Sequence, residues 1–323
     1  LEFRRVLFRS CNPDRYALAL ENARQDQPDF HIDLGDTFRL DSAVRDPLSL
    51  TWDDVLARSL AHRPFFHPLT CSAPLFLVPG NHDAEYGWYA NPDSGFHPSL
   101  PVWATNARKL VYPNPAPDGF YSGNTVQYES IDGGLRENYY AWEWGDALFV
   151  VLDPYWEKTS KNTRNWGPVH GEEQYRWFRD TLRASNATHK FVFEHHLHGE
   201  TRGGVEVASL YEWGGRDQKG AWLFDRMRPG WDAPMHHLMA EAGVKIYFQG
   251  HDHLWAKGEL DGIVYLTLPM PGAGPDPAGP YYFPYGDNDD AYPQSEILPN
   301  SGHVRVKVAP DHVDVEYVSV RLP

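Results

Sequence analysis

The chain has 323 residues, of which 41% are hydrophobic and 14% aromatic, so its length and composition suit one large domain or two ordinary ones. Its net charge is −15, and it has no run of Lys or Arg, which disfavours general nucleic-acid binding because phosphate backbones require basic partners. No apolar run approaches the ~20 residues of a transmembrane helix. An acidic protein that acts on phosphate esters needs bound cations to reverse the local field.

The first half of the chain alternates predicted helices and strands. Asn12 and Pro13 have the residue types of a helix start, and this helix should stop before Pro28. A strand over 30–34 then ends at Gly35-Asp36-Thr37. A helix over 52–62 and a strand over 74–79 follow, and this second strand ends at Gly80-Asn81-His82-Asp83. The alternation predicts a layered α/β fold.

The second half begins with an aromatic insertion over about 84–138, which we expect to form a wall of the site. The remaining elements are predicted as a hairpin (139–144 with 147–152), a helix (172–183), a strand ending at His195 (190–194), helical segments (223–227 and 234–242), a strand before Gly250-His251-Asp252-His253 (244–248), a strand (262–268), an irregular Pro/Gly-rich surface loop (269–300) and a final hairpin (304–308 with 313–320). Without a linker between two cores, residues 11–323 are predicted to form one domain.

Other segments leave the compartment and the oligomeric state open. Residues 1–10 resemble translated vector sequence and are excluded from the fold; we expect an authentic start, with a first strand, upstream. Cys11 and Cys71 can pair or stay free. Aromatic richness and the sequon Asn186-Ala187-Thr188 lean towards export without fixing the location.

Four predicted strand ends carry side chains that can bind metal. These side chains are Asp36, Asn81, His195 and the pair His251 and His253. Ligands of open α/β sheets bind at the carboxyl ends of strands, so the four clusters should meet there. A donor set of carboxylate, amide oxygen and imidazole without thiolate favours Mn, Fe, Zn or Co over a structural Cys-zinc site.

In order and spacing, the motifs Gly35-Asp36, Gly80-Asn81-His82-Asp83, His195 and Gly250-His251-Asp252-His253 resemble those of the calcineurin-like metallophosphoesterase superfamily. The resemblance covers about residues 12–270. It implies an α/β/β/α sandwich, in which helices flank two mixed sheets. It also implies metal-dependent hydrolysis of a small phosphate mono- or diester, with the choice between the two left open.

The resemblance also implies a role for each motif residue. Asp36 would bridge two metals; Asn81, His195 and His251 would complete the second metal site, and His253 would belong to the first. His82, oriented by Asp83, would stand beside the leaving group as proton donor or charge stabiliser. A hydroxide bridging the metals would attack phosphorus in line.

Residues near these motifs are candidates for further contacts. Arg202, in a Gly-rich loop, could bind a substrate phosphate, since guanidinium groups match phosphate geometry. His196 either supports a ligand or faces substrate. The aromatic run Tyr86, Trp88 and Tyr89 either lines the pocket or packs within the insertion.

The chain departs from the family pattern at two positions. The family's D-x-H motif is absent: Asp29-Phe30-His31 has the right letters but lies on the strand of Asp36, roughly 20 Å away at ~3.3 Å per residue. We therefore expect one metal site to be well formed and the other poor. The alternative function is a catalytically impaired relic that binds metal or phosphate.

Arg39 stands where purple acid phosphatases carry a tyrosine, so that branch is not expected. A metalloprotease is disfavoured because no H-E-x-x-H motif occurs.

Overall fold

The structure is a computed structural model that describes residues 12–158, 166–167, 169–198, 202–273, 289–299 and 301–320. The vector-like tail and Cys11 lie outside these residues, and Cys71 is an exposed free thiol. Among the described helices, none has the length and apolar character needed to cross a membrane.

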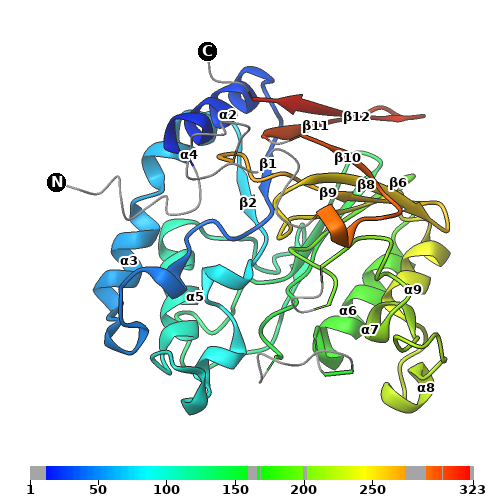
Figure 1. The fold of residues 1–323 in the computed structure, drawn as a ribbon, viewed down its shortest axis with the longest axis horizontal. Helices are drawn as coiled ribbons and strands as arrows, with labels where there is room; N and C mark the ends of the chain where they lie inside the picture. The colour runs from blue at the N-terminus through cyan, green and yellow to red at the C-terminus, as the bar shows by residue number, and fades with distance from the viewer. Residues whose placement is uncertain are drawn as a thin grey trace.

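An eight-stranded mixed sheet forms the centre of the molecule (Figure 1). Its strands, in spatial order, are β10 (Glu296–Leu298), β8 (Trp255–Leu260), β9 (Ile263–Thr267), β7 (Ile246–Gln249), β6 (His189–Phe193), β5 (Ala147–Val151), β4 (Tyr140–Trp144) and β3 (Ser122–Gly123). The inner strands β5, β6, β7 and β9 are parallel, whereas the outer pairs are antiparallel. Strands β5 to β7 are buried throughout, as expected for parallel strands covered on both faces.

Two small sheets pack on one face of the large sheet. Strand β1 (His31–Asp33) pairs in parallel with β2 (Leu75–Leu77), and β11 (Gly302–Val308) pairs antiparallel with β12 (Val313–Ser319). Aromatic side chains of the large sheet, among them Phe149 and Phe193, fill the space beneath them. Helices α2 (Pro13–Gln25) and α4 (Arg63–Thr70) pack together through Tyr16, Leu20 and Phe66, next to β1 and β2.

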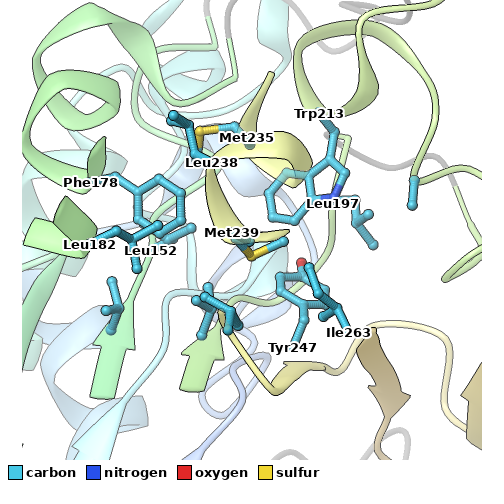
Figure 2. Close-up of a cluster of buried hydrophobic side chains, with 14 of the residues drawn as sticks. Leu152, Phe178, Leu182, Leu197, Trp213, Met235, Leu238, Met239, Tyr247 and Ile263 are labelled. Atoms are coloured by element: carbon cyan, nitrogen blue, oxygen red, sulfur yellow. The ribbon is translucent and has the colours of Figure 1, made fainter. Parts of the chain in front are cut away.

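The opposite face of the large sheet is covered by α6 (Gly171–Ala184), α7 (Tyr211–Gly214) and α9 (Met235–Ala242). Figure 2 shows Phe178, Leu182, Leu238 and Met239 meeting side chains of the sheet in this core. The remaining helices are α3 (Trp52–Leu60), α5 (Leu100–Val111) and α8 (Phe224–Met227). The large sheet and the two small sheets thus form two layers between two layers of helices, which confirms the predicted α/β/β/α layering.

Most predicted elements are present, including the Asn12 cap, whose side chain accepts from the N–H groups of Asp14 and Arg15. Helix α4 was not predicted, because Pro64 and Pro68 interrupt the helical sequence pattern of its eight residues. The prediction of a surface loop over 269–300 was wrong in its last third. There β10 pairs with β8, and Tyr292 is buried with its hydroxyl donating to Asp252. Residues 274–288 of that loop lie outside the described part.

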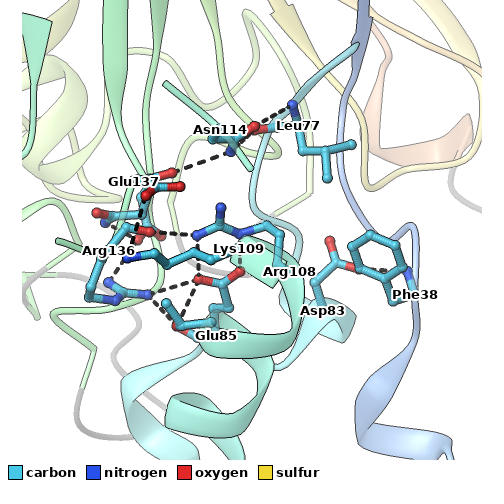
Figure 3. Close-up of polar contacts among 12 residues, drawn as sticks. Phe38, Leu77, Asp83, Glu85, Arg108, Lys109, Asn114, Arg136 and Glu137 are labelled. Atoms are coloured by element: carbon cyan, nitrogen blue, oxygen red, sulfur yellow. Dashed lines mark hydrogen bonds and ion pairs between the residues drawn. The ribbon is translucent and has the colours of Figure 1, made fainter. Parts of the chain in front are cut away.

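Within the aromatic insertion, a buried ionic network surrounds Glu85, two residues after the second motif (Figure 3). Arg108 of α5 donates to Glu85 through Nε at 2.5 Å. Arg136 reaches both Glu85 and Asp153 at 3.3 Å, and its guanidinium lies 3.7 Å from the Trp156 ring centroid. Because each buried charge is paired, the network fixes the loop after β2 against the loop after β5.

The loops after β1 and β2 touch through glycine backbone. A Cβ built on Gly35 would lie 2.7 Å from the Gly80 nitrogen, and Gly35 has a φ of +92°. A Cβ built on Gly80 would clash with the Asp36 nitrogen and lie 2.6 Å from its Oδ1. These two glycines therefore set how closely the two motifs approach.

We expect Gly80→Ala to lower the free energy of unfolding by at least ~1–3 kcal/mol, the usual cost of overpacking, because its new methyl group meets backbone that cannot yield. Gly204→Ala is the matched control, since its Cβ would have only ordinary contacts, the nearest at 3.5 Å. Urea denaturation measures both variants. Equal stability of the two would contradict the assigned role of Gly80.

Candidate metal centre

Four strand ends converge on one point, as the sequence predicts. His251, after β7, places its Nδ1 2.9 Å from Asn81 Oδ1 and 3.3 Å from His195 Nε2. His195 Nε2 also lies 3.3 Å from Asp36 Oδ2. Ligand atoms of Asp36, His195 and His251 all lie within 4.8 Å of one another, which makes these three residues a candidate metal group among the described residues.

The donor atoms of this group fit a cation. The Nδ1 of His195 lies 2.5 Å from the Leu34 carbonyl, which can only accept, so Nδ1 carries the proton and the Nε2 lone pair points at Asp36. The Nε2 lone pair of His195, the Asp36 carboxylate and the Asn81 amide oxygen are all electron-rich. They repel one another unless a positive charge lies between them. Burial disfavours a charged imidazole, but the Asp36 carboxylate outweighs it and raises the pKa of His195. A transition metal supplies the same positive charge and suits this mixed donor set.

A buried network at Glu194 also fixes the strand end that carries His195. Glu194, the residue before it, is fully buried and accepts from the Tyr247 hydroxyl at 3.0 Å. Its other oxygen lies 2.6 Å from His170 Nε2, and His170 Nδ1 lies 2.8 Å from Glu212. This buried network anchors the end of β6 to the covering helices.

Three of the nine described non-glycine residues with positive φ lie at the same place. Asp36, His251 and His253 have φ values of 59°, 63° and 56°, in the left-handed region that non-glycine residues seldom adopt. Each costs of order 1–3 kcal/mol at a strained site, and the surrounding contacts must hold it. Strain at three residues from two separate loops supports a functional site.

Asp83 joins the two loops instead of orienting His82. Its carboxylate accepts from the backbone N–H of Phe38 at 2.8 Å (Figure 3). It also accepts from the backbone N–H groups of Asp36 at 2.9 Å and Gly80 at 3.0 Å. Burial and the neighbouring Asp36 charge raise the pKa of Asp83, and the backbone donors oppose that rise. The expectation that Asp83 orients His82 was therefore wrong: its oxygens are occupied by backbone.

Asp41, and not Asp83, contacts the ring of His82. Its Oδ2 lies 2.6 Å from His82 Nδ1, and the Tyr89 hydroxyl donates to the same oxygen at 3.3 Å. The backbone N–H of His82 donates to Asp36 Oδ1 at 2.7 Å, which places this residue next to the metal group. Burial lowers the pKa of His82, but the charge on Asp36 and the contact with Asp41 raise it to about 9. Asp41 belongs to no motif, and no spacing rule in the sequence marks it.

Two further predicted residues lie against His251. The His196 ring is buried, with its centroid 4.5 Å from that of His251, and its Nδ1 lies 3.0 Å from the Tyr155 hydroxyl. Both predicted roles of His196, supporting a ligand or facing substrate, stay predictions. Arg202 donates through Nη1 to Asp252 Oδ1 at 2.7 Å and to the His251 carbonyl at 3.3 Å, while 40% of its side chain stays exposed.

His253 and the aromatic run lie apart from the three-residue group. His253 is half-buried and lines the same cavity as Asp36 and His251, but is not one of the three. Tyr86 and Tyr89 are buried and pack with Tyr155 and Phe96, which favours the packing interpretation of that run.

The comparisons with known proteins agree with this geometry. The sequence profile of the calcineurin-like phosphoesterase family matches residues 9–254, so the chain belongs to that family. Members of this family hold a dinuclear centre of divalent metals. No curated protein matches the chain.

Several solved structures match the fold of this chain, and two of them are described here. Purple acid phosphatase PPD1 from yellow lupin seeds is 16% identical with a TM-score of 0.55, over 96% of this chain and 47% of that one. PhoD is 13% identical with a TM-score of 0.59, over 95% of this chain and 66% of that one. The chain thus spans about half of the first protein and just under two thirds of the second.

We expect the chain to bind Mn²⁺ or Zn²⁺, and His251→Ala to weaken that binding by at least ~10-fold, because the variant loses a ligand that also orders Asn81 and His195. Isothermal titration calorimetry measures the affinity. His312→Ala, on the exposed turn between β11 and β12, is the control and should bind as the parent chain does. Unchanged affinity in His251→Ala would rule out this group as the metal site.

Proposed function

We propose that this chain is a metal-dependent hydrolase of small phosphate mono- or diesters. The observation that carries the proposal is the convergence of Asp36, Asn81, His195 and His251, with His82 bound to Asp36 through its backbone N–H. Asp36, His195 and His251 line one cavity. Two transition metals, Mn, Fe, Zn or Co, are the proposed cofactors. When bound, such metals stabilise charge on the phosphoryl oxygens and supply a nucleophile at neutral pH.

The proposed ligands divide between the two metals. Asp36 would be shared, Asn81, His195 and His251 would hold one metal, and His253 would hold the other. The support is that the first four donors already converge, whereas His253 lines the same cavity a little apart. The second position therefore has fewer donors among the described residues.

His82 is the proposed proton donor to the leaving oxygen. Asp41 occupies its Nδ1, so Nε2 is the nitrogen left to donate. About a third of the side chain is exposed, which leaves the ring accessible to a bound ester. Its raised pKa keeps the imidazole charged at neutral pH, as a general acid requires.

Arg202 is the proposed phosphate contact. Asp252 and the His251 carbonyl hold its Nη1 beside the metal group, and the rest of the guanidinium remains available for a substrate oxygen. Tyr292 and the Gly203 N–H fix Asp252 from the other side, at 2.6 and 3.0 Å.

The second candidate function is a relic that binds metal or phosphate without turnover. The observation that favours it is that, among the described residues, His253 is not part of the three-residue metal group. The two candidates differ in catalysis and not in metal affinity.

Hydrolysis of p-nitrophenyl phosphate and bis-p-nitrophenyl phosphate, with Mn²⁺ or Zn²⁺ and with chelator, tests the proposal. We expect metal-dependent release of nitrophenol, and a loss of at least ~100-fold in kcat/KM in Asp36→Ala, because in-line phosphoryl transfer depends on charge stabilisation. His312→Ala should be as active as the parent chain. Metal binding without any metal-dependent turnover would favour the relic and contradict the hydrolase.

Asp41→Asn tests the proton donor. We expect kcat to fall ~10–100-fold for an alkyl phosphate, less for the nitrophenyl ester, and KM and metal affinity to stay unchanged, since only a poor leaving group needs protonation. Asp311→Asn, on an exposed turn, is the matched control. An equal loss for both esters would indicate a merely structural role for Asp41.

A further inference from the structure

Arg39 is a charged residue near the metal group for which the proposed mechanism has no use. Within the part of the chain that the structure describes, its guanidinium forms no hydrogen bond or ion pair. The residue is half-buried, and its Nε is buried from solvent without a partner. Buried polar groups of native proteins are almost always hydrogen-bonded, so an unpaired guanidinium nitrogen requires an explanation.

The backbone holds Arg39 in a fixed position. Phe38, the residue before it, donates its N–H to Asp83 Oδ1 at 2.8 Å, and its carbonyl accepts from Arg58 Nε at 2.9 Å. Arg39 has a φ of 50°, in the left-handed region, and its carbonyl accepts from the Ser42 N–H at 3.2 Å. A bulky residue in this conformation is strained, and strain of this kind is typical of functional sites.

Arg39 lies on the side of the metal group where His82 stands. It lines the same cavity as Asp36, and it precedes Asp41, whose carboxylate contacts the ring of His82. Burial lowers the pKa of His82 and the two carboxylates raise it, while the charge of Arg39 opposes their effect. An effect of this kind requires the guanidinium to lie close to the imidazole.

The charges on this side of the site do not balance. The guanidinium of Arg58 also lies nearby: burial lowers the pKa of Arg58, the charge of Arg39 lowers it further, and Asp41 opposes both. Arg39, Arg58 and His82 thus share the carboxylates of Asp36 and Asp41, and a bound metal would engage Asp36. In a chain with a net charge of −15, this local excess of positive charge favours an anion.

Other arginines near the motifs are paired. Arg202 forms an ion pair with Asp252 at 2.7 Å, and it lies on the other side of the metal group, where it donates to the His251 carbonyl. Arg108 forms an ion pair with Glu85. Since Arg202 is the proposed contact of the phosphate that is hydrolysed, the unpaired cation on the side of the proton donor is available for another part of the substrate.

We propose that Arg39 binds an anionic group of the leaving group, so that the preferred substrates are small phosphate esters whose alcohol part carries a carboxylate or a second phosphate. Both anions present the oxygen atoms that a guanidinium binds through parallel hydrogen bonds. His82 is the proposed donor to the leaving oxygen, so a cation next to it meets the leaving group. The position of the leaving group rests on the proposed function.

Three non-hydrolysable probes with the same carbon chain test the proposal: propylphosphonate, 3-phosphonopropionate and propane-1,3-diphosphonate. The end of the chain is uncharged in the first, a carboxylate in the second and another phosphonate in the third. Isothermal titration calorimetry measures their binding to the full chain loaded with Mn²⁺. We expect one of the charged probes to bind at least ~10-fold more tightly than propylphosphonate, because hydrogen bonds between charged groups contribute at least that factor. The probe that binds best identifies the anion.

Arg39→Gln should remove this preference and leave the affinity for propylphosphonate unchanged. Because the Arg39 side chain has no partner to lose, the variant should keep the Tm of the parent chain. Arg176→Gln is the matched control. It removes an arginine from an exposed ion pair on α6 and should bind all three probes as the parent chain does.

Equal affinity of the parent chain for all three probes would overturn the proposal, as would a preference that persists in Arg39→Gln or no binding of either charged probe. An equal loss for charged and uncharged probes in Arg39→Gln would place Arg39 at the hydrolysed phosphate and also contradict the proposal.

The probes report binding and not turnover, so the two proposals can fail separately. Hydrolysis of the nitrophenyl esters without any preference among the probes would contradict the anion site alone. A preference that depends on Arg39, in a chain that hydrolyses no ester, would contradict the hydrolase and retain Arg39 as an anion-binding residue.

Discussion

The site depends on the backbone contact between the loops after β1 and β2. Gly35 and Gly80 approach so closely that neither has room for a Cβ, and the Asp83 carboxylate joins the two loops through three backbone N–H groups. This contact presents Asp36 in a left-handed conformation, with its carboxylate towards His195 and its second oxygen towards the His82 N–H. The position of Asp36 in the metal group and the position of His82 beside it both depend on this contact.

The sequence predicts well which side chains converge, because each of them lies immediately after an apolar strand. Asp36, Asn81, His195 and His251 could be brought together from strand ends alone, since parallel strands deliver their carboxyl ends to one edge. The layering was predictable for the same reason: helical and strand periodicities are local properties of the chain. The short helix α4, between β1 and β2, was not predicted because its two prolines interrupt the helical sequence pattern.

What the sequence did not predict depends on contacts between distant segments. Asp41 reaches His82 across 41 positions, and Tyr292 reaches Asp252 across 40, so neither could be inferred from local spacing. The motif suggests that Asp83 orients His82, but the oxygens of Asp83 accept from three backbone N–H groups.

The central claim is that one cation is held where the four strand ends meet. Anomalous X-ray diffraction from crystals of the full chain grown with Mn²⁺ or Zn²⁺ tests this claim most directly. The account predicts an anomalous peak in contact with Asp36, Asn81, His195 and His251. A metal bound elsewhere in the molecule, with these four side chains still contacting only one another, would contradict it.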